Sequence, residues 1–211
     1  IFFLGIEGGF SMAGVGAFTI RVAVSELGPV GVLVSGQVPG GILLEPITGL
    51  AINDFVGSVD FFSTLPELTT TEQLRDPALS GGSSIDPETW LSTVQLQIAA
   101  QYKAIQANPN TGGFRAAFTE PMVITGSARI FSLYASETAF NGLITIKLST
   151  DGKFLGIGKF NFANEALSMS GRIYANLSKI AQGSATVLFL ADIPDQVELL
   201  SIRGKFSMGF T

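Results

Sequence analysis

The sequence contains neither histidine nor cysteine. Histidine is the side chain whose ordinary pKa lies nearest neutrality, the commonest metal ligand and the usual base for a serine nucleophile. Cysteine supplies disulfides, thiolate metal ligands and thiol nucleophiles. The two absences exclude a Ser-His-Asp triad, a disulfide framework and any site built on Cys or His. Serine–lysine pairs and carboxylate pairs stay open, but no residue singles out such a site, so we expect a non-enzymatic protein with no cofactor and no metal site.

Charge is also scarce, because Asp, Glu, Lys and Arg make up 14% of the 211 residues, against roughly 25% in an average soluble domain. Hydrophobic residues make up 46%. A chain this apolar can bury enough surface to offset its ordering entropy, so disorder is not expected. The length fits one β-rich domain over residues 1–211. Ile1 and Thr211 lie within strand-like stretches, which favours a segment of a longer chain.

The net charge of −5 is unevenly distributed. Residues 1–100 hold ten carboxylates and two basic residues, whereas residues 101–211 hold seven carboxylates and ten basic residues. This asymmetry is either a chance dipole or a basis for head-to-tail packing of copies. The overall acidity and the lack of a Lys/Arg run argue against a nucleic-acid partner.

Residues 1–62 are expected to form apolar strands punctuated by glycine and proline. The uncharged run 27–44 is 18 residues long, which reaches the length of a membrane-spanning helix. However, Pro29, Pro39 and five glycines break such a helix, so we predict a strand, a turn and another strand. The expected strands are Ala17–Val24, Val30–Val38, Ile42–Leu44 and Phe55–Phe62.

Residues 63–121 are expected to hold loops and one amphipathic helix over residues 87–107. Asp86 is a good N-cap and Pro87 suits the first helical position. An apolar stripe follows at helical spacing, with Gln101 on the side nearer solvent. The stripe consists of Leu91, Val94, Ile98, Tyr102 and Ile105.

Residues 122–211 predict an antiparallel meander. Alternation is clearest over 167–177, where apolar residues such as Ile173 alternate with polar ones such as Arg172 and Tyr174. We expect the apolar set on the core and the polar set in water. Thr150-Asp151-Gly152-Lys153 predicts a two-residue hairpin turn. The fold class is therefore mainly β: an antiparallel sheet assembly, sandwich-like or extended and curved, with the helix packed on it.

The two ends of the chain carry the candidate interaction residues. They are apolar and strand-like, and an end strand at a sheet edge aggregates unless it is paired. The residues are Phe2, Phe3, Leu4 and Ile6 at the start and Phe206, Met208 and Phe210 at the end.

The leading hypothesis is a structural module that self-assembles through its terminal strands, as a subunit or segment of a secreted or cell-surface polymer or filament. Its partners would be copies of itself or other parts of a longer chain. The alternative is a carrier of lipid or another apolar ligand, with glycine-rich strands curved into a groove roofed by the helix. Lower alternatives are an outer-membrane barrel segment and a carboxylate-type hydrolase using Glu45, Asp54 and Asp60.

Overall fold

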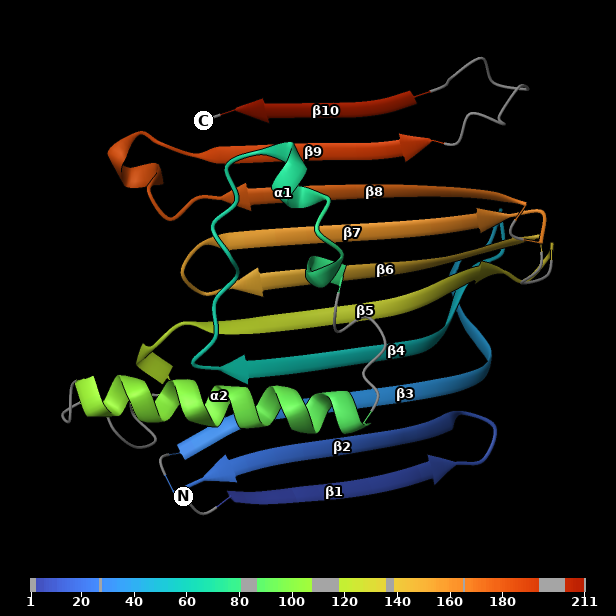
Figure 1. Cartoon of the computed structure of the whole chain (residues 1–211). Helices are drawn as coiled ribbons and strands as arrows, with labels where there is room; N and C mark the ends of the chain where they lie inside the picture. The colour runs from blue at the N-terminus through green and yellow to red at the C-terminus, as the bar shows by residue number, and fades with distance from the viewer. Residues whose placement is uncertain are drawn as a thin grey trace.

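The computed structural model describes residues 3–26, 28–80, 87–107, 118–135, 139–164, 166–193 and 204–210, with the backbone alone for 3, 80, 87–89, 91 and 204–210. Ten strands form one sheet in which each strand pairs with its neighbours in sequence, so the order is β1 to β10 and every pairing is antiparallel (Figure 1). The strands are β1 (Phe3–Met12), β2 (Gly16–Ser25), β3 (Gly28–Glu45), β4 (Leu50–Phe61), β5 (Met122–Ser132), β6 (Phe140–Ser149), β7 (Lys153–Phe162), β8 (Leu167–Asn176), β9 (Thr186–Ile193) and β10 (Gly204–Phe210).

This architecture confirms a mainly β fold and selects an open extended sheet over a sandwich. β1 and β10 are its two edges. The predicted helix is α2 (Pro87–Ala107), with the expected bounds. The proposed cap at Asp86 lies outside the described residues.

The long helix α2 and the short helical turns of residues 71–80 lie on one face of the sheet (Figure 1). α2 lies over β2–β4 at one end of the sheet and runs roughly along the strands, whereas residues 62–80, which we call the strap, cross β5–β9 at the other end. The strap contains α1 (Thr71–Leu74) and the 3₁₀ turn η1 (Pro77–Ser80); a second 3₁₀ turn, η3 (Ile180–Gln182), joins β8 to β9. We call the covered surface the helix-bearing face.

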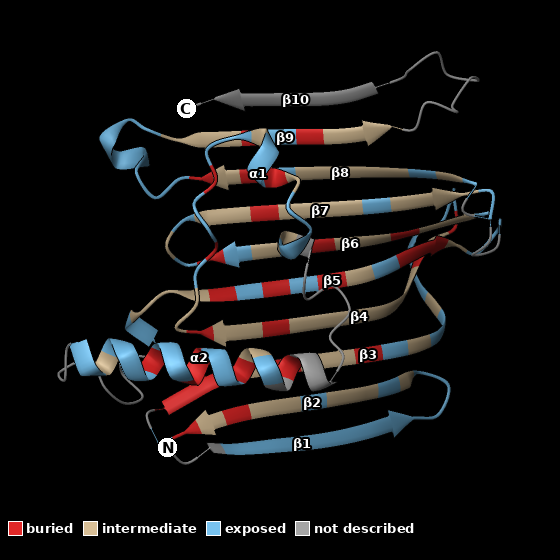
Figure 2. Ribbon diagram, in the orientation of Figure 1, coloured by how far each residue is buried: buried red, intermediate tan, exposed pale blue. Residues whose placement is uncertain are grey.

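Two apolar clusters hold these elements to the sheet (Figure 2). Under α2, Trp90, Val94 and Ile98 pack against β2 and β3. Under the strap, three leucines pack against strand residues around the fully buried Tyr174. The clusters are Ala23, Val30, Leu33, Trp90, Val94 and Ile98, and Leu65, Leu68, Leu74, Val123, Leu155, Tyr174, Leu188 and Leu190.

The strap is also tied down by hydrogen bonds from strand side chains. Arg172 donates to the carbonyl oxygens of Leu74 and Asp76, at 2.7 and 2.9 Å. Lys147 donates to the carbonyl of Leu79, at 3.1 Å. These contacts satisfy carbonyl groups of a short irregular segment that has few backbone partners of its own.

Two expected turns are wrong. Pro39-Gly40-Gly41 does not separate two strands: β3 runs through it, and Val38 to Gly41 lie opposite Asn53 alone, between the pairs Gln37–Asp54 and Ile42–Ile52. Four residues facing one make a large bulge, which Gly40 and Gly41 permit with φ of 82° and 75°. The β6–β7 hairpin forms where expected, but Ser149 pairs with Lys153, so its loop has three residues, 150–152.

The buried stripe of α2 also differs from the expectation. Gln101 is fully buried, whereas Tyr102 is 40% exposed. The reason is that α2 lies partly on polar sheet residues: the Ser25 hydroxyl donates to Gln101 Oε1 at 3.3 Å. A polar residue on the buried side is therefore satisfied there.

Candidate functional site

The sheet register places apolar residues on the face opposite the helices. Side chains alternate between faces along a strand, and paired residues share a face. Three rows of one residue from each of β1–β9 contain no polar side chain; we call them the apolar face. The rows are Ile6, Val22, Val32, Val59, Ile124, Leu148, Phe154, Ala175 and Val187; Gly8, Ile20, Val34, Gly57, Gly126, Ile146, Gly156, Ile173 and Phe189; and Phe10, Phe18, Gly36, Phe55, Ala128, Ile144, Gly158, Gly171 and Ala191.

No described segment covers this face. Every residue of the three rows is exposed or half-buried except Gly36. Exposure does not fall toward the middle of the sheet, since Ile124 in β5 and Ile146 in β6 are each 43% exposed. Nine strands about 4.8 Å apart and three rows about 7 Å apart give an area on the order of 900 Å². That exceeds the roughly 300–600 Å² of the largest apolar patch on a typical monomer.

The expected assignment of faces along 167–177 is therefore wrong. Tyr174 and Asn176 are buried on the helix-bearing face, at 0% and 7% exposure, whereas Ile173 on the apolar face is 40% exposed. Alternation correctly grouped these residues into two sets. The strap, however, covers the polar set, because its leucines build a core around Tyr174.

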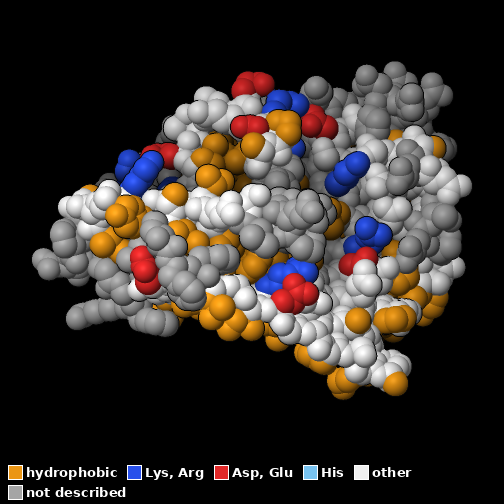
Figure 3. Space-filling view, turned by 60° about the horizontal axis from the view of Figure 1, so that its bottom comes forward, with side chains coloured by type: hydrophobic (Ala, Val, Ile, Leu, Met, Phe, Trp, Pro, Cys, Tyr) orange, Lys and Arg blue, Asp and Glu red, His pale blue; other side chains and the backbone are white. Residues whose placement is uncertain are grey.

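Charged strand residues follow the same division. Within the paired register of β1–β9 they lie on the helix-bearing face, apart from Glu45 at the β3–β4 turn. They are Glu7, Arg21, Asp54, Asp60, Arg129, Lys147, Lys153, Lys159, Arg172 and Asp192. Figure 3 shows acidic and basic side chains beside one another on this face, with hydrophobic side chains along the lower rim.

The two oppositely charged halves of the sequence meet within the chain. Of the six ion pairs among the described residues, three join residues 1–100 to residues 101–211: Asp54–Arg129, Arg75–Asp192 and Glu67–Lys179. In Asp54–Arg129 and Glu67–Lys179 the acid comes from the acidic half and the base from the basic half, whereas Arg75–Asp192 is the reverse. The charge asymmetry thus contributes two ion pairs within the chain.

Phenylalanine rings on this side of the sheet lie across neighbouring glycines. A Cβ built at Gly36 would stand 2.5 Å from the ring of Phe55. In the row next to the three of the apolar face, a Cβ at Gly142 would stand 2.7 Å from the ring of Phe160. Phe10 and Phe18 stack on adjacent strands with ring centroids 5.1 Å apart. The rings therefore fill the hollows above some of the glycines, and the surface is shallower there.

Of the predicted terminal residues, Leu4 and Ile6 lie in β1 and are 47% and 55% exposed. Phe2 lies outside the described residues, and for Phe3 the backbone alone is described. Phe206, Met208 and Phe210 pair in register with Ala191, Phe189 and Val187 of β9; their side chains lie outside the description.

β1 is an edge strand with little protection. It pairs with β2 alone, and each residue from Leu4 to Met12 is exposed. It contains no proline or lysine, and its single charge, Glu7, is held by Arg21 at 2.6 Å. Natural sheets usually guard such edges with charge, proline or a covering segment.

A polar cluster lies under α2. Asp60 accepts a hydrogen bond from Ser58, at 3.1 Å. Burial raises the pKa of Asp60, while hydrogen bonds from Gln97 and Ser58 and the charge of Lys147 lower it in part. Burial also lowers the pKa of Lys147, against the charge of Asp60. This cluster helps seat the helix on the sheet, but it holds one carboxylate and lies beneath a packed element.

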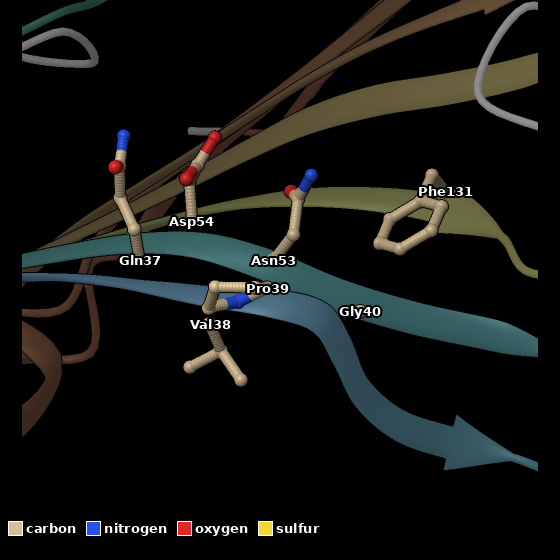
Figure 4. A pocket seen from close by; sticks show the side chains of 7 residues that line it. All are labelled: Gln37, Val38, Pro39, Gly40, Asn53, Asp54 and Phe131. Carbon is tan, nitrogen blue, oxygen red and sulfur yellow. The ribbon is translucent and has the colours of Figure 1, made fainter. Parts of the chain in front are cut away.

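The bulge in β3 forms a pocket of about 350 Å³ at one end of the sheet. Gln37, Asn53 and Asp54 point to one side of the strands and Val38 to the other (Figure 4). Asp54 is the one ionisable residue among its lining residues, and Arg129 lies 3.6 Å from it. A single carboxylate neutralised by arginine offers no acid–base pair.

The carboxylates considered for a hydrolase do not meet. Asp54 and Asp60 are six residues apart on β4, about 20 Å at the rise of a strand, whereas paired glycosidase carboxylates lie within about 10 Å. Glu45 instead accepts hydrogen bonds from the backbone of Ile47 and Thr48, each at 2.7 Å. Across the described residues no cluster of three acidic groups could hold a metal ion.

In the part of the chain that is described, no helix is both long enough and apolar enough to cross a bilayer.

Comparison with known proteins finds no family model that matches the chain, no similar curated protein and no similar solved structure.

Proposed function

We propose that the chain is a non-enzymatic structural module that joins a larger β-assembly by pairing at its sheet edges. The observation that carries this proposal is the β1 edge, which is ten residues long, exposed and unguarded by lysine or proline. Its backbone groups on the side away from β2 face no other strand of the sheet. A neighbouring strand would satisfy them by strand addition.

The number of strands suits such pairing. Ten antiparallel strands leave β1 and β10 running in opposite directions. A second copy in the same orientation, with its β1 beside β10 of the first, therefore continues the alternation of the sheet. All helix-bearing faces then lie on one side and all apolar faces on the other. The neighbour can equally be another part of a longer chain.

The size of the protein over a dilution series tests this proposal. We expect oligomers whose mass grows with concentration in light scattering, and Gly9→Lys should abolish them. Gly9 lies in the middle of β1 on the helix-bearing face, and a Cβ there would meet only the Phe18 carbonyl oxygen, at 3.6 Å. The side chain is thus accommodated, while its charge opposes a strand at the edge.

Ser168→Lys is the matched control, because Ser168 is exposed on the same face but lies in the interior strand β8. It should assemble like the wild type. A monodisperse monomer at all concentrations, or oligomers unaffected by Gly9→Lys, would contradict edge pairing.

A further inference from the structure

We propose that the apolar face binds the acyl chains of lipids, which lie against β1–β9 on the side opposite the helices. This inference goes beyond edge pairing, because it assigns an occupant to a different surface. It also departs from the groove expected from the sequence, in which the helix was the roof: α2 packs on the other face, against Ala23 and Leu33.

The chemistry of the face identifies the occupant as hydrocarbon. Its three rows offer no charge and no side-chain hydrogen-bond donor or acceptor. Even the buried core of a protein interface is only about 65% apolar, and an interface carries about one hydrogen bond per 100–200 Å², so a protein partner normally buries polar groups. Those groups would lose water against this face and gain no partner. An acyl chain has no such groups to lose.

The relief of the face also favours a fluid hydrocarbon over a second copy. Close packing of two sheets requires side chains that interdigitate. Here the ring of Phe55 lies over Gly36 of the neighbouring strand, which removes one hollow into which a partner's side chain could fit. Between β4 and β5, adjacent Gly57 and Gly126 leave a bare stretch of backbone, since no atom lies within 4 Å of a Cβ built at Gly126. A flexible chain can follow both the filled and the bare parts of this surface, whereas a rigid second sheet would need a side chain placed opposite each hollow.

The division of charge supports the same occupant. The charged strand residues on the helix-bearing face are turned away from the proposed hydrocarbon and meet one another, water or the strap. Arg21 pairs with Glu7 and Arg172 with the strap carbonyls. A charge on the apolar face would be desolvated by a bound chain at high cost.

The test uses palmitate that carries a nitroxide near its methyl end, added to the delipidated protein with labelled Ile and Leu methyl groups. Because broadening falls steeply with distance, bound probe should broaden the methyl signals of Ile124, Ile146 and Ile173 much more than those of Leu155, Leu188 and Leu190, which are buried on the helix-bearing face. Native mass spectrometry of the freshly purified protein should show copurified lipid.

Gly126→Lys should weaken palmitate binding by roughly tenfold or more, because the ammonium group must lose water under the bound chain. Unchanged signals of Leu155 and Leu188 would show that the variant is folded. Gly9→Lys is the control, since it lies on the opposite face and should bind palmitate like the wild type. Gly9→Lys also separates the two proposals. If this variant binds palmitate but does not form oligomers, the apolar face binds lipid independently of pairing at the β1 edge.

Three results would overturn the proposal. The first is broadening that is equal on the two faces. The second is palmitate affinity unchanged by Gly126→Lys. The third is a lipid-free dimer that Gly126→Lys, but not Gly9→Lys, converts to monomer, because the occupant would then be the apolar face of a second copy.

Discussion

The hydroxyl of Tyr174, in β8, donates a hydrogen bond to the carbonyl oxygen of Pro66, 108 residues earlier in the chain, at 3.0 Å. The hydroxyl oxygen of Tyr174 in turn accepts a hydrogen bond from the backbone N–H of Leu68, at 3.3 Å. One buried side chain thus satisfies two backbone groups of the strap and fixes where the strap crosses the sheet.

Tyr174→Phe should lower the free energy of unfolding by about 1–3 kcal/mol, because the Pro66 carbonyl and Leu68 N–H then lack a partner away from water. Urea denaturation measures this. Tyr134→Phe is the control: Tyr134 also donates to a proline carbonyl, that of Pro46, but is 69% exposed. Its removal should change stability by less than about 0.5 kcal/mol. Equal losses in the two variants would show that burial of the tyrosine does not matter.

Asp60 should make the protein less stable at neutral pH than at acid pH. Because burial raises its pKa in the folded state, its contribution to stability is present below the pKa of the unfolded chain and is lost as pH rises through the folded pKa. Asp60→Asn should therefore raise the melting temperature at pH 7 and give no gain at pH 3. Asp54→Asn, at an ion pair with Arg129, should show no such gain at pH 7. A fall in melting temperature for Asp60→Asn at pH 7 would contradict this account.

Asp151 should have the opposite pH dependence. Burial would raise its pKa, but hydrogen bonds from Lys153, Ser149 and Thr64 outweigh that and lower it. Its contribution is thus present above the unfolded pKa and is lost as pH falls through the folded pKa. Since Thr64 lies in the strap and donates to Asp151, the protection factors of the Leu65 and Leu68 amides against hydrogen exchange should fall as the carboxyl protonates. In Asp151→Asn, the amides of Leu65 and Leu68 should exchange faster than in the wild type at pH 6. Equal protection in the two proteins at that pH would show that Asp151 does not hold the strap.

Gly142 and Gly126 should respond differently to alanine. A Cβ at Gly142 would lie 2.7 Å from the Phe160 ring, 3.1 Å from Ile130 and 3.2 Å from the Lys159 carbonyl oxygen. Gly142→Ala should therefore cost about 1–3 kcal/mol through overpacking. Gly126 has open space, so Gly126→Ala should be neutral or stabilise by up to about 1 kcal/mol. Thermal denaturation compares the two, and a loss at Gly126 would mean that its Cβ position is occupied.

The strands and α2 were accessible from sequence because their signals are local. Pro87 marks the start of α2, and apolar runs bounded by glycine and proline mark the strands. Which face is covered was not accessible. Alternation sorts Ile173 and Tyr174 onto opposite faces, but the core side depends on where the strap crosses, which long-range bonds such as Arg172 to Leu74 decide. One signal was available in the sequence. The charged residues of the strands fall in the same one of the two alternating sets along the meander, which marks the other set as the apolar face.

The bulge was missed for a related reason. Pro39-Gly40-Gly41 resembles a hairpin turn, and local sequence does not show that the partner strand continues past it. The pairs Gln37–Asp54 and Ile42–Ile52 reveal this only once β4 is placed beside β3.

That bulge has a consequence for how the sheet tolerates changes in chain length. Val38 to Gly41 make no ladder pairs with β4, so residues inserted or removed there would alter the size of the protrusion and leave Gln37 and Ile42 with their partners. Elsewhere in β3, a single inserted residue would move every following side chain of the strand to the opposite face of the sheet. The segment between Gln37 and Ile42 is thus the place in β3 where a loop or an epitope could be grafted without turning the strand over.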